Sequence, residues 1–452
     1  MPRQLSAIIC ILFIFYLFWV DRNKSDIVSK AVWIPQIWMF IAGSRFVSQW
    51  LNLGAPKVAD IYLEGNPVDR IVFLILILAG TIILVQRRPN WSDLITKNAW
   101  IWLFFIFGAI SILWSDFPFV SFKRWIKALG NVIMALVILT EERPYEAIGV
   151  ILRRLTFLLI PLSVLFIKYY PDLGRAYHWD GTQMFTGVTS QKNSLGQICL
   201  ISGTYFCWSL LLYQREWIAL RQRLHLSACL ILISMIVWLF YKANSATSFV
   251  CMAVAIGLFL FSRKFRVDSK PRRILHFGIA CILLFGLLEL TFDVTAAVIT
   301  MLGRDSTLTT RVPMWNQLLS MVKNPIFGFG YESFWLGDRQ QIIRKTWGIA
   351  FNAHNGYLEM YLNLGLIGVS FMLIWILSGL RKVARHLEID YPSAMLRLCL
   401  IVVIALYNWT EATFYGVSNM WVLFLFAVIE ISNQQHRAEP IAAAGAKNKA
   451  EP

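Results

Sequence analysis

The sequence predicts an all-α polytopic membrane protein. Of its 452 residues 58% are hydrophobic and only 15% are charged, and its apolar runs repeatedly reach the ~20 residues that a helix needs to cross a bilayer. The formal net charge of +16 is carried by short basic clusters between those runs. Such a distribution is typical of positive-inside topology rather than of a nucleic-acid-binding face. We therefore expect about twelve or thirteen transmembrane helices and one long outer loop.

Runs of ~16 or more mostly apolar residues locate the spans. The first run, Leu5 to Val20, is followed by no small-residue cleavage site and is interpreted as a retained span. Thirteen spans place the N-terminus outside, and twelve result if the first segment or the Pro35-interrupted second one does not cross. The predicted spans lie near residues 5–20, 33–51, 69–86, 98–115, 124–140, 149–168, 194–213, 225–242, 246–262, 273–292, 355–380, 394–412 and 416–433.

The alternation of basic and less basic loops predicts the orientation, because loops rich in Lys and Arg resist translocation. The outer loops are then 52–68, 115–123, 169–193 and 293–354, and the C-terminus is inside. The chain accordingly divides into an N-terminal bundle (1–292), a periplasmic loop carrying the proposed active site (293–354), C-terminal helices (355–433) and a disordered cytoplasmic tail (434–452).

Several cations lie at outer span ends or in outer loops, against the positive-inside bias. An anionic ligand at the outer interface explains such cations, and snorkelling to lipid phosphates is the alternative for any one of them. They are Arg45, Lys123, Arg124, Lys127, Lys192, Lys242, Arg304 and Arg311.

Arg304 and Arg311 are the most informative of these cations, because a run of hydroxyl side chains lies between them. Guanidinium groups bind phosphate oxygens in pairs. The apolar spacing predicts a surface helix from Arg311 to Val322, with Thr310 as N-cap and Pro313 in the first turn. Its first amides would point at an anion held by Arg311, although an ordinary capped interfacial helix is the alternative.

His354 stands just before the span that begins near Asn355. Histidine titrates near neutral pH when unperturbed and therefore suits a general base. Glu359 could orient it or take that role, whereas a polar surface histidine next to an Asn355 N-cap is the alternative.

The outer loops hold no Asp-x-Asp pair and no His/Asp/Glu cluster at metal-ligand spacing, which disfavours a metal-dependent transferase. No nucleotide-binding glycine pattern is present, and the seven cysteines all fall within spans. We therefore expect no metal and no cofactor.

An ordered series of motifs resembles the O-antigen ligase and Wzy-type polymerase superfamily over most of the chain. The motifs are Trp33-Ile34-Pro35 with Ser44-Arg45, Glu64 to Arg70, Thr186-Gly187 with Gln191 to Gly196, Ser245 to Ser248, Gly303-Arg304-Asp305 to Arg311 with Trp315, Asn324-Pro325 to Tyr331, Phe334-Trp335, His354 to Glu359, and Leu364 to Gly368.

The resemblance implies a glycosyltransferase C-like enzyme at the periplasmic face of the bacterial inner membrane. It would transfer a sugar chain from undecaprenyl diphosphate to an acceptor hydroxyl, among membrane lipids and with a chain-length regulator as a further partner. By similarity Arg304 or Arg311, with Lys192, would bind the diphosphate, and His354 would lie near the acceptor. Arg45 and Lys242 complete the predicted diphosphate-binding set.

Three functions stay open on the sequence alone. A polymerase of exopolysaccharide repeat units and a ligase that transfers glycan to lipid A core or another acceptor share the same chemistry. The chain has Ser245-Ala246-Thr247 where many ligases carry Ser-Arg, which favours the polymerase. A flippase is the third, and is disfavoured because the ionisable residues sit toward outer span ends rather than at mid-membrane.

Overall fold

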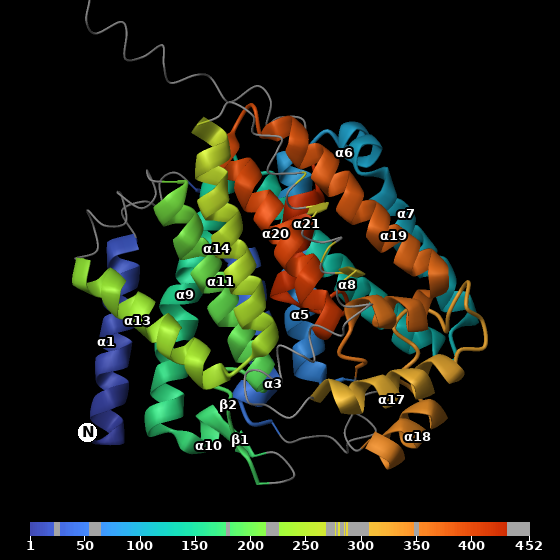
Figure 1. The fold of residues 1–452 in the computed structure, drawn as a ribbon, viewed down its shortest axis with the longest axis horizontal. Coiled ribbons are helices and arrows are strands. Elements are labelled where there is room, and N and C mark those ends of the chain that lie inside the picture. The colour runs from blue at the N-terminus through green and yellow to red at the C-terminus, as the bar shows by residue number, and fades with distance from the viewer. Residues whose placement is uncertain are drawn as a thin grey trace, which may run out of the picture.

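The computed structural model shows a bundle of α-helices with one small β-hairpin (Figure 1). It describes residues 1–21, 28–53, 65–177, 181–213, 226–267, 307–347 and 352–431, together with isolated positions between 276 and 287. The predicted class, an all-α polytopic membrane protein, is confirmed.

The helices are α1 (Arg3–Asp21), α2 (Trp33–Ala42), α3 (Val47–Trp50), α5 (Pro67–Arg87), α6 (Trp91–Lys97), α7 (Ala99–Ser111), α8 (Pro118–Leu139), α9 (Pro144–Tyr169), α10 (Pro171–Gly174), α11 (Lys192–Leu211), α13 (Leu226–Ala243), α14 (Ala246–Val267), α17 (Thr307–Ser320), α18 (Asp338–Trp347), α19 (Gly356–His386), α20 (Tyr391–Thr410) and α21 (Asn419–Val428). Short 3-10 turns occupy Lys30–Val32 and Ile112–Trp114, and strands β1 (Arg175–Tyr177) and β2 (Gln183–Phe185) pair antiparallel.

Among the described residues, 6 helices are long and apolar enough to cross a membrane: α1, α5, α9, α11, α19 and α20. A bend of 86° separates α6 from α7, and the pair is either one broken span or a re-entrant loop. The apolar parts of helices α13, α14 and α21 are 10–17 residues long and are therefore shorter than these candidate spans. The predicted span 273–292 lies almost entirely outside the described residues, so the total number of spans stays a prediction.

The predicted span 33–51 is not one helix, because α2 ends at Ala42 and α3 starts at Val47. Pro35 does not cause the break, since it lies in the first turn of α2, where a missing amide costs little. The helix ends at Gly43, where an added Cβ would meet the Asn419 amide nitrogen at 2.5 Å. The residues between the two helices include Arg45.

The predicted span 355–380 is also broken, at Gly365, whose φ of 63° and ψ of −161° are not helical. The loop 325–330 lies against this break and pairs with its backbone. The amides of Phe329 and Gly330 donate to Leu362 and Asn363, at 3.2 and 2.9 Å, and the Leu366 amide donates to Pro325 at 2.8 Å. A kink inside a membrane helix requires such partners, because lipid offers no hydrogen bonds to the freed groups.

One end of the bundle carries the hairpin β1–β2, α3, α10, α17 and α18 (Figure 1). We call it the outer end, because it brings together the predicted outer loop 169–193 and the described part of 293–354. The N-terminus lies at the same end (Figure 1), where the Tyr170 hydroxyl donates to the Arg3 carbonyl at 3.2 Å. The opposite end, which carries α6, is called the inner end.

Candidate active site

Four polar side chains meet at the outer end, from α11, α17, the start of α19 and the end of α20. Asn193 donates to the Glu411 carboxylate at 2.6 Å. The Arg311 guanidinium lies 3.6 Å from the same carboxylate oxygen, and His354 Nδ1 lies 3.4 Å from the other oxygen. We call Asn193, Arg311, His354 and Glu411 the Glu411 cluster.

The C-terminal end of helix α20 positions Glu411, the carboxylate that the other three residues of the cluster contact. Glu411 is the C-cap of α20, and its carbonyl accepts from the Gly356 amide at 3.1 Å. Arg311 Nη1 donates to the Thr410 carbonyl at 2.6 Å, an arrangement in which a cation meets the negative end of the helix dipole. Gly356 permits this approach, because a Cβ there would meet the Asn408 side-chain oxygen at 2.2 Å.

The backbone holds His354 in a special conformation. Its φ of 49° is in the left-handed region, which costs a non-glycine residue on the order of 1–3 kcal/mol and is concentrated at functional sites. The His354 amide donates to the Asn352 side chain at 2.9 Å. Asn355 caps α19, since its side-chain oxygen accepts from the Tyr357 and Leu358 amides at 3.0 Å each. The Asn355 N-cap that the alternative interpretation of His354 included is therefore present.

The cluster is accessible but not fully solvated. The exposed side-chain fractions are 12% for Glu411, 17% for Arg311 and 36% for His354. A carboxylate only accepts hydrogen bonds, so a neutral His354 would donate from Nδ1 to Glu411 and present Nε2 as an acceptor. This arrangement, a base oriented by a carboxylate, is the one that general-base catalysis uses.

Glu359 does not contact the His354 ring. Its carboxylate accepts from the Ala353 amide at 2.5 Å and from Trp335 Nε1 at 3.0 and 2.9 Å, and the residue is only 4% exposed. It therefore supports the backbone that precedes His354. The carboxylate that meets the imidazole is Glu411, and a catalytic role for Glu359 stays a prediction.

The predicted cations fall into two groups. Arg45 donates to the Thr189 carbonyl at 3.4 and 3.2 Å and to the Leu173 carbonyl, and Lys242 lies 5.0 Å from the Phe185 ring centroid. Both therefore hold the loop before α11 rather than the Glu411 cluster. Lys192, in contrast, is the first residue of α11 and the sequence neighbour of Asn193. Arg304 lies outside the described residues.

Helix α17 starts earlier than predicted. It begins at Thr307 rather than after a Thr310 N-cap, and Pro313 lies inside it. Proline removes its own amide hydrogen bond and its ring crowds the carbonyl four residues earlier, yet the helix continues through Pro313. Arg311 is consequently one turn into the helix, and the predicted N-cap at Thr310 was wrong.

Sequence reasoning did not select Glu411 or Asn193 as site residues. Glu411 offered a weak signal, because an acidic residue at the end of an apolar run is unusual in a membrane protein. Asn193 offered none beyond its place next to Lys192. In the part of the chain that the structure describes, no group of three or more His, Cys, Asp or Glu side chains could hold a metal ion.

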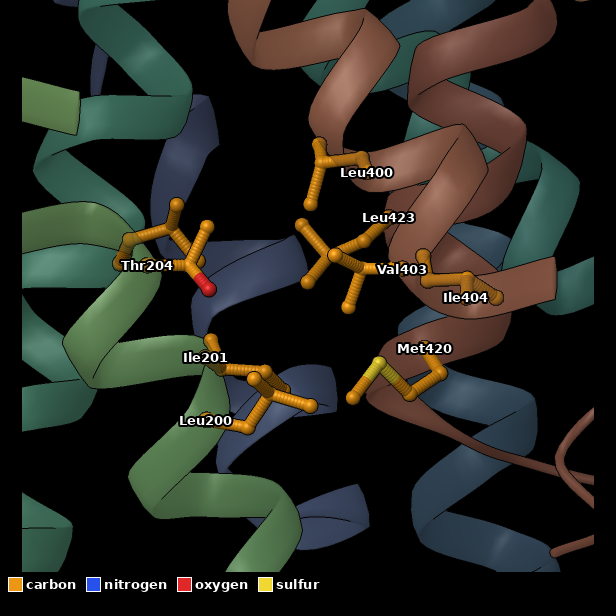
Figure 2. A pocket seen from close by; sticks show the side chains of 9 residues that line it. Leu200, Ile201, Thr204, Leu400, Val403, Ile404, Met420 and Leu423 are labelled. Carbon is orange, nitrogen blue, oxygen red and sulfur yellow. The ribbon is translucent and has the colours of Figure 1, made fainter. Parts of the chain in front are cut away.

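A cavity deeper in the bundle is different in kind (Figure 2). The volume of this cavity is about 10 Å³, too little for a sugar or a diphosphate. Apart from Thr204 its walls are apolar, and they come from α9, α11, α20 and α21. The lining residues are Leu152, Leu200, Ile201, Thr204, Leu400, Val403, Ile404, Met420 and Leu423.

Comparison with known proteins shows which class of enzyme the chain is similar to. Residues 228–373 match the family model described as O-antigen ligase. The matched range includes Arg311 and His354 and ends before Glu411. The chain is a multi-pass membrane enzyme of the polysaccharide polymerase or ligase type.

A curated relative narrows the comparison. The chain is 27% identical over 369 residues to the exopolysaccharide production protein ExoQ of Rhizobium meliloti (strain 1021), an alignment that covers 76% of this chain and 80% of the relative. The resemblance to the O-antigen ligase and polymerase superfamily, predicted from the motifs, is confirmed.

Proposed function

We propose that this enzyme polymerises oligosaccharide repeat units carried on undecaprenyl diphosphate into bacterial exopolysaccharide, at the periplasmic face of the inner membrane. The observation that carries the proposal is the Glu411 cluster. It combines an arginine, a histidine and a carboxylate at one end of a membrane bundle, in partial contact with solvent.

Arg311 is assigned to the diphosphate of the donor. Diphosphate is already a good leaving group, so the enzyme mainly has to stabilise the charge that develops on the bridging oxygen. Arg311 uses one donor on the Thr410 carbonyl, and its 3.6 Å separation from Glu411 leaves hydrogen-bonding capacity for phosphate oxygens. Lys192 and Arg304 would add positive charge, so that the step needs no metal ion.

His354 is assigned to the acceptor. In the proposed step the acceptor oxygen forms a bond with the anomeric carbon while its proton passes to His354 Nε2. The bond from the anomeric carbon to the diphosphate oxygen breaks, and the lipid diphosphate leaves with the electron pair. Glu411 stabilises the imidazolium that forms, at the observed 3.4 Å. A single displacement of this kind inverts the anomeric centre.

A ligase is the second candidate, and the match to the O-antigen ligase model favours it. It uses the same residues, and differs in passing finished glycan to lipid A core or another acceptor. The similarity to a protein named for exopolysaccharide production favours the polymerase.

The test is to delete the gene, complement it with wild type, Arg311→Ala or His354→Ala, and size the lipid-linked glycans and the secreted polysaccharide. We expect both variants to lose polymer and to accumulate single repeat units on the lipid. Long lipid-linked chains would instead establish the ligase. Unchanged glycans in the deletion strain would overturn the proposed function.

A further inference from the structure

A second charged group lies at the outer end, between α8 and two loops. Arg124, Lys127 and Asn131 share one face of α8, because they are spaced at three and four residues. The Asn131 amide donates to the Gly416 carbonyl at 2.8 Å, and Arg124 donates to the Glu332 carbonyl. The Gly416 amide donates to Glu332 Oε1 at 2.8 Å. These bonds fix the Glu332 carboxylate against this face of α8.

The Lys127 ammonium has no direct polar partner in the described part of the chain. It lies 6.0 and 5.7 Å from the ring centroids of Phe46 and Phe73, and it interacts electrostatically with Glu332, Arg124 and Asp69. Neither carboxylate lies within 4.0 Å of the Lys127 ammonium, so neither forms an ion pair with it. Lys127 and Glu332 are both partly exposed.

The two carboxylates near Lys127 differ in whether an oxygen atom is still free to accept a hydrogen bond. Asp69 is occupied, since it accepts from the Ser48 amide at 2.9 Å and from the Ser48 hydroxyl at 2.6 Å. Glu332 uses Oε1 for the Gly416 amide, and Oε2 accepts no hydrogen bond from any residue that the structure describes. The Lys127 ammonium and the Glu332 carboxylate therefore lie at the same face of α8, where Arg124 and Gly416 hold Glu332, and they form no ion pair with each other.

We infer that Lys127 and Glu332 form a glycan-binding subsite that holds a sugar hydroxyl of the substrate. A hydroxyl both accepts and donates, so it can bridge an ammonium and a carboxylate that do not touch. An anion at this position would be repelled by Glu332 and a cation by Lys127. Phe46 and Phe73 add apolar faces beside the ammonium. That the bound glycan is the enzyme's substrate rests on the proposed function.

The subsite is connected to the Glu411 cluster by the segment 411–416. Glu411 begins this segment, and Gly416, which holds Glu332, ends it. Between them the Tyr415 hydroxyl accepts from the Asn352 amide at 3.2 Å, and Asn352 in turn accepts from the His354 amide. A sugar bound at Lys127 would thus contribute binding energy at a distance from the reacting atoms, which enzymes use to position a long substrate.

Titration of the purified full-length protein in detergent tests the subsite. The probe is the free repeat-unit oligosaccharide released from the native polysaccharide, and binding is followed by calorimetry. Lys127→Met keeps the apolar stem, and Glu332→Gln keeps an oxygen for the Gly416 amide. We expect each variant to bind the probe about tenfold more weakly or worse, as for a lost hydrogen bond to a charged group, with an unchanged melting temperature. Lys345→Met, at an exposed lysine of α18, should bind like wild type.

The outcomes separate this inference from the proposed function. Wild-type affinity in Lys127→Met, or no binding of the oligosaccharide by wild type, would overturn the subsite. Arg311→Ala should bind the oligosaccharide as wild type does and make no polymer. If Arg311→Ala makes polymer while Lys127→Met loses binding, the proposed catalytic role fails and the subsite stands.

Discussion

Each end of the bundle holds a carboxylate between two basic side chains, and the two groups differ in how accessible they are to solvent. At the inner end Asp21 of α1 accepts from Arg153 Nε and Arg154 Nε of α9, at 2.8 Å each. The exposed side-chain fractions there are 3% for Asp21, 2% for Arg153 and 8% for Arg154. At the outer end His354 is 36% exposed, and no nitrogen of Arg311 comes closer than 3.6 Å to Glu411. Both carboxylate oxygens of the inner group are therefore bonded to arginines, whereas the arginine of the outer group keeps donors that a ligand can use.

This difference separates a structural role from a chemical one. A buried ion pair in which every oxygen is taken fastens two helices and leaves no atom for a ligand, and the loss of one partner exposes the other charge to an apolar interior. An arginine with unused donors next to an oriented histidine can instead receive phosphate and a proton. The same residue types therefore stabilise α1 against α9 at one end and are proposed to act on substrate at the other.

The largest effect is expected for Arg311→Ala. Removing a preorganised charge from the proposed diphosphate site should lower polymer formation by about 10²- to 10³-fold or more, with normal amounts of protein in the membrane. Polymer formed per mole of purified protein is the measurement. Arg344→Ala, at an exposed position of α18, is the matched control and should keep full activity. Near-normal polymer from Arg311→Ala would remove Arg311 from the mechanism.

Asp21→Asn should give the opposite pattern. Breaking a buried pair on one side costs about 3–5 kcal/mol, so we expect a lower melting temperature in detergent and less protein in the membrane. The protein that remains folded should turn over at the wild-type rate, because Asp21 is at the inner end. A reduced rate without a change in melting temperature would mean that the inner group takes part in the reaction and does not only stabilise the fold.

Glu411→Gln should reduce activity less than Arg311→Ala does. Glutamine keeps an oxygen that can accept from Asn193, but it removes the charge that would stabilise the His354 imidazolium. We expect a loss of about 10- to 100-fold in turnover, with the melting temperature unchanged. A fall in melting temperature comparable to that of Asp21→Asn would make the outer cluster structural as well.

The smallest effect is expected for Thr204→Val at the apolar cavity. Figure 2 shows the Thr204 hydroxyl facing the cavity, and valine replaces it with a methyl group of similar size. The free energy of unfolding should change by no more than about 1 kcal/mol, and turnover should not change. A large loss of turnover would show that the interior between α11 and α20 takes part in function.

Much of the fold could be predicted from the sequence, because span length and loop charge are local properties. The Asn355 cap was predictable for the same reason, since a side chain at a helix start bonds amides two and three residues on. The break at Gly43 and the kink at Gly365 were not. Each depends on what lies opposite: Asn419 faces Gly43, and the Ile326 carbonyl would lie 2.2 Å from a Cβ at Gly365.

The site was predictable only in part. The sequence marked Arg311 and His354 because a cation and a histidine at an outer loop are unusual. It assigned the partner carboxylate to Glu359, the near neighbour in sequence, whereas Glu411 approaches from 57 residues away. Contacts across that distance depend on how α19 and α20 pack, which periodicity does not encode.

A double-mutant cycle between Arg311 and Glu411 would test most directly whether the outer cluster acts as one unit. Arg311→Lys keeps a charge and should leave a measurable rate, so turnover can be compared among Arg311→Lys, Glu411→Gln and the double variant. Residues that act together are not additive. We therefore predict that the double variant is no more than about threefold slower than the slower single variant. If the double variant lost turnover by the product of the two single-variant factors, as independent sites do, the claim that the Glu411 cluster acts as one unit would be contradicted.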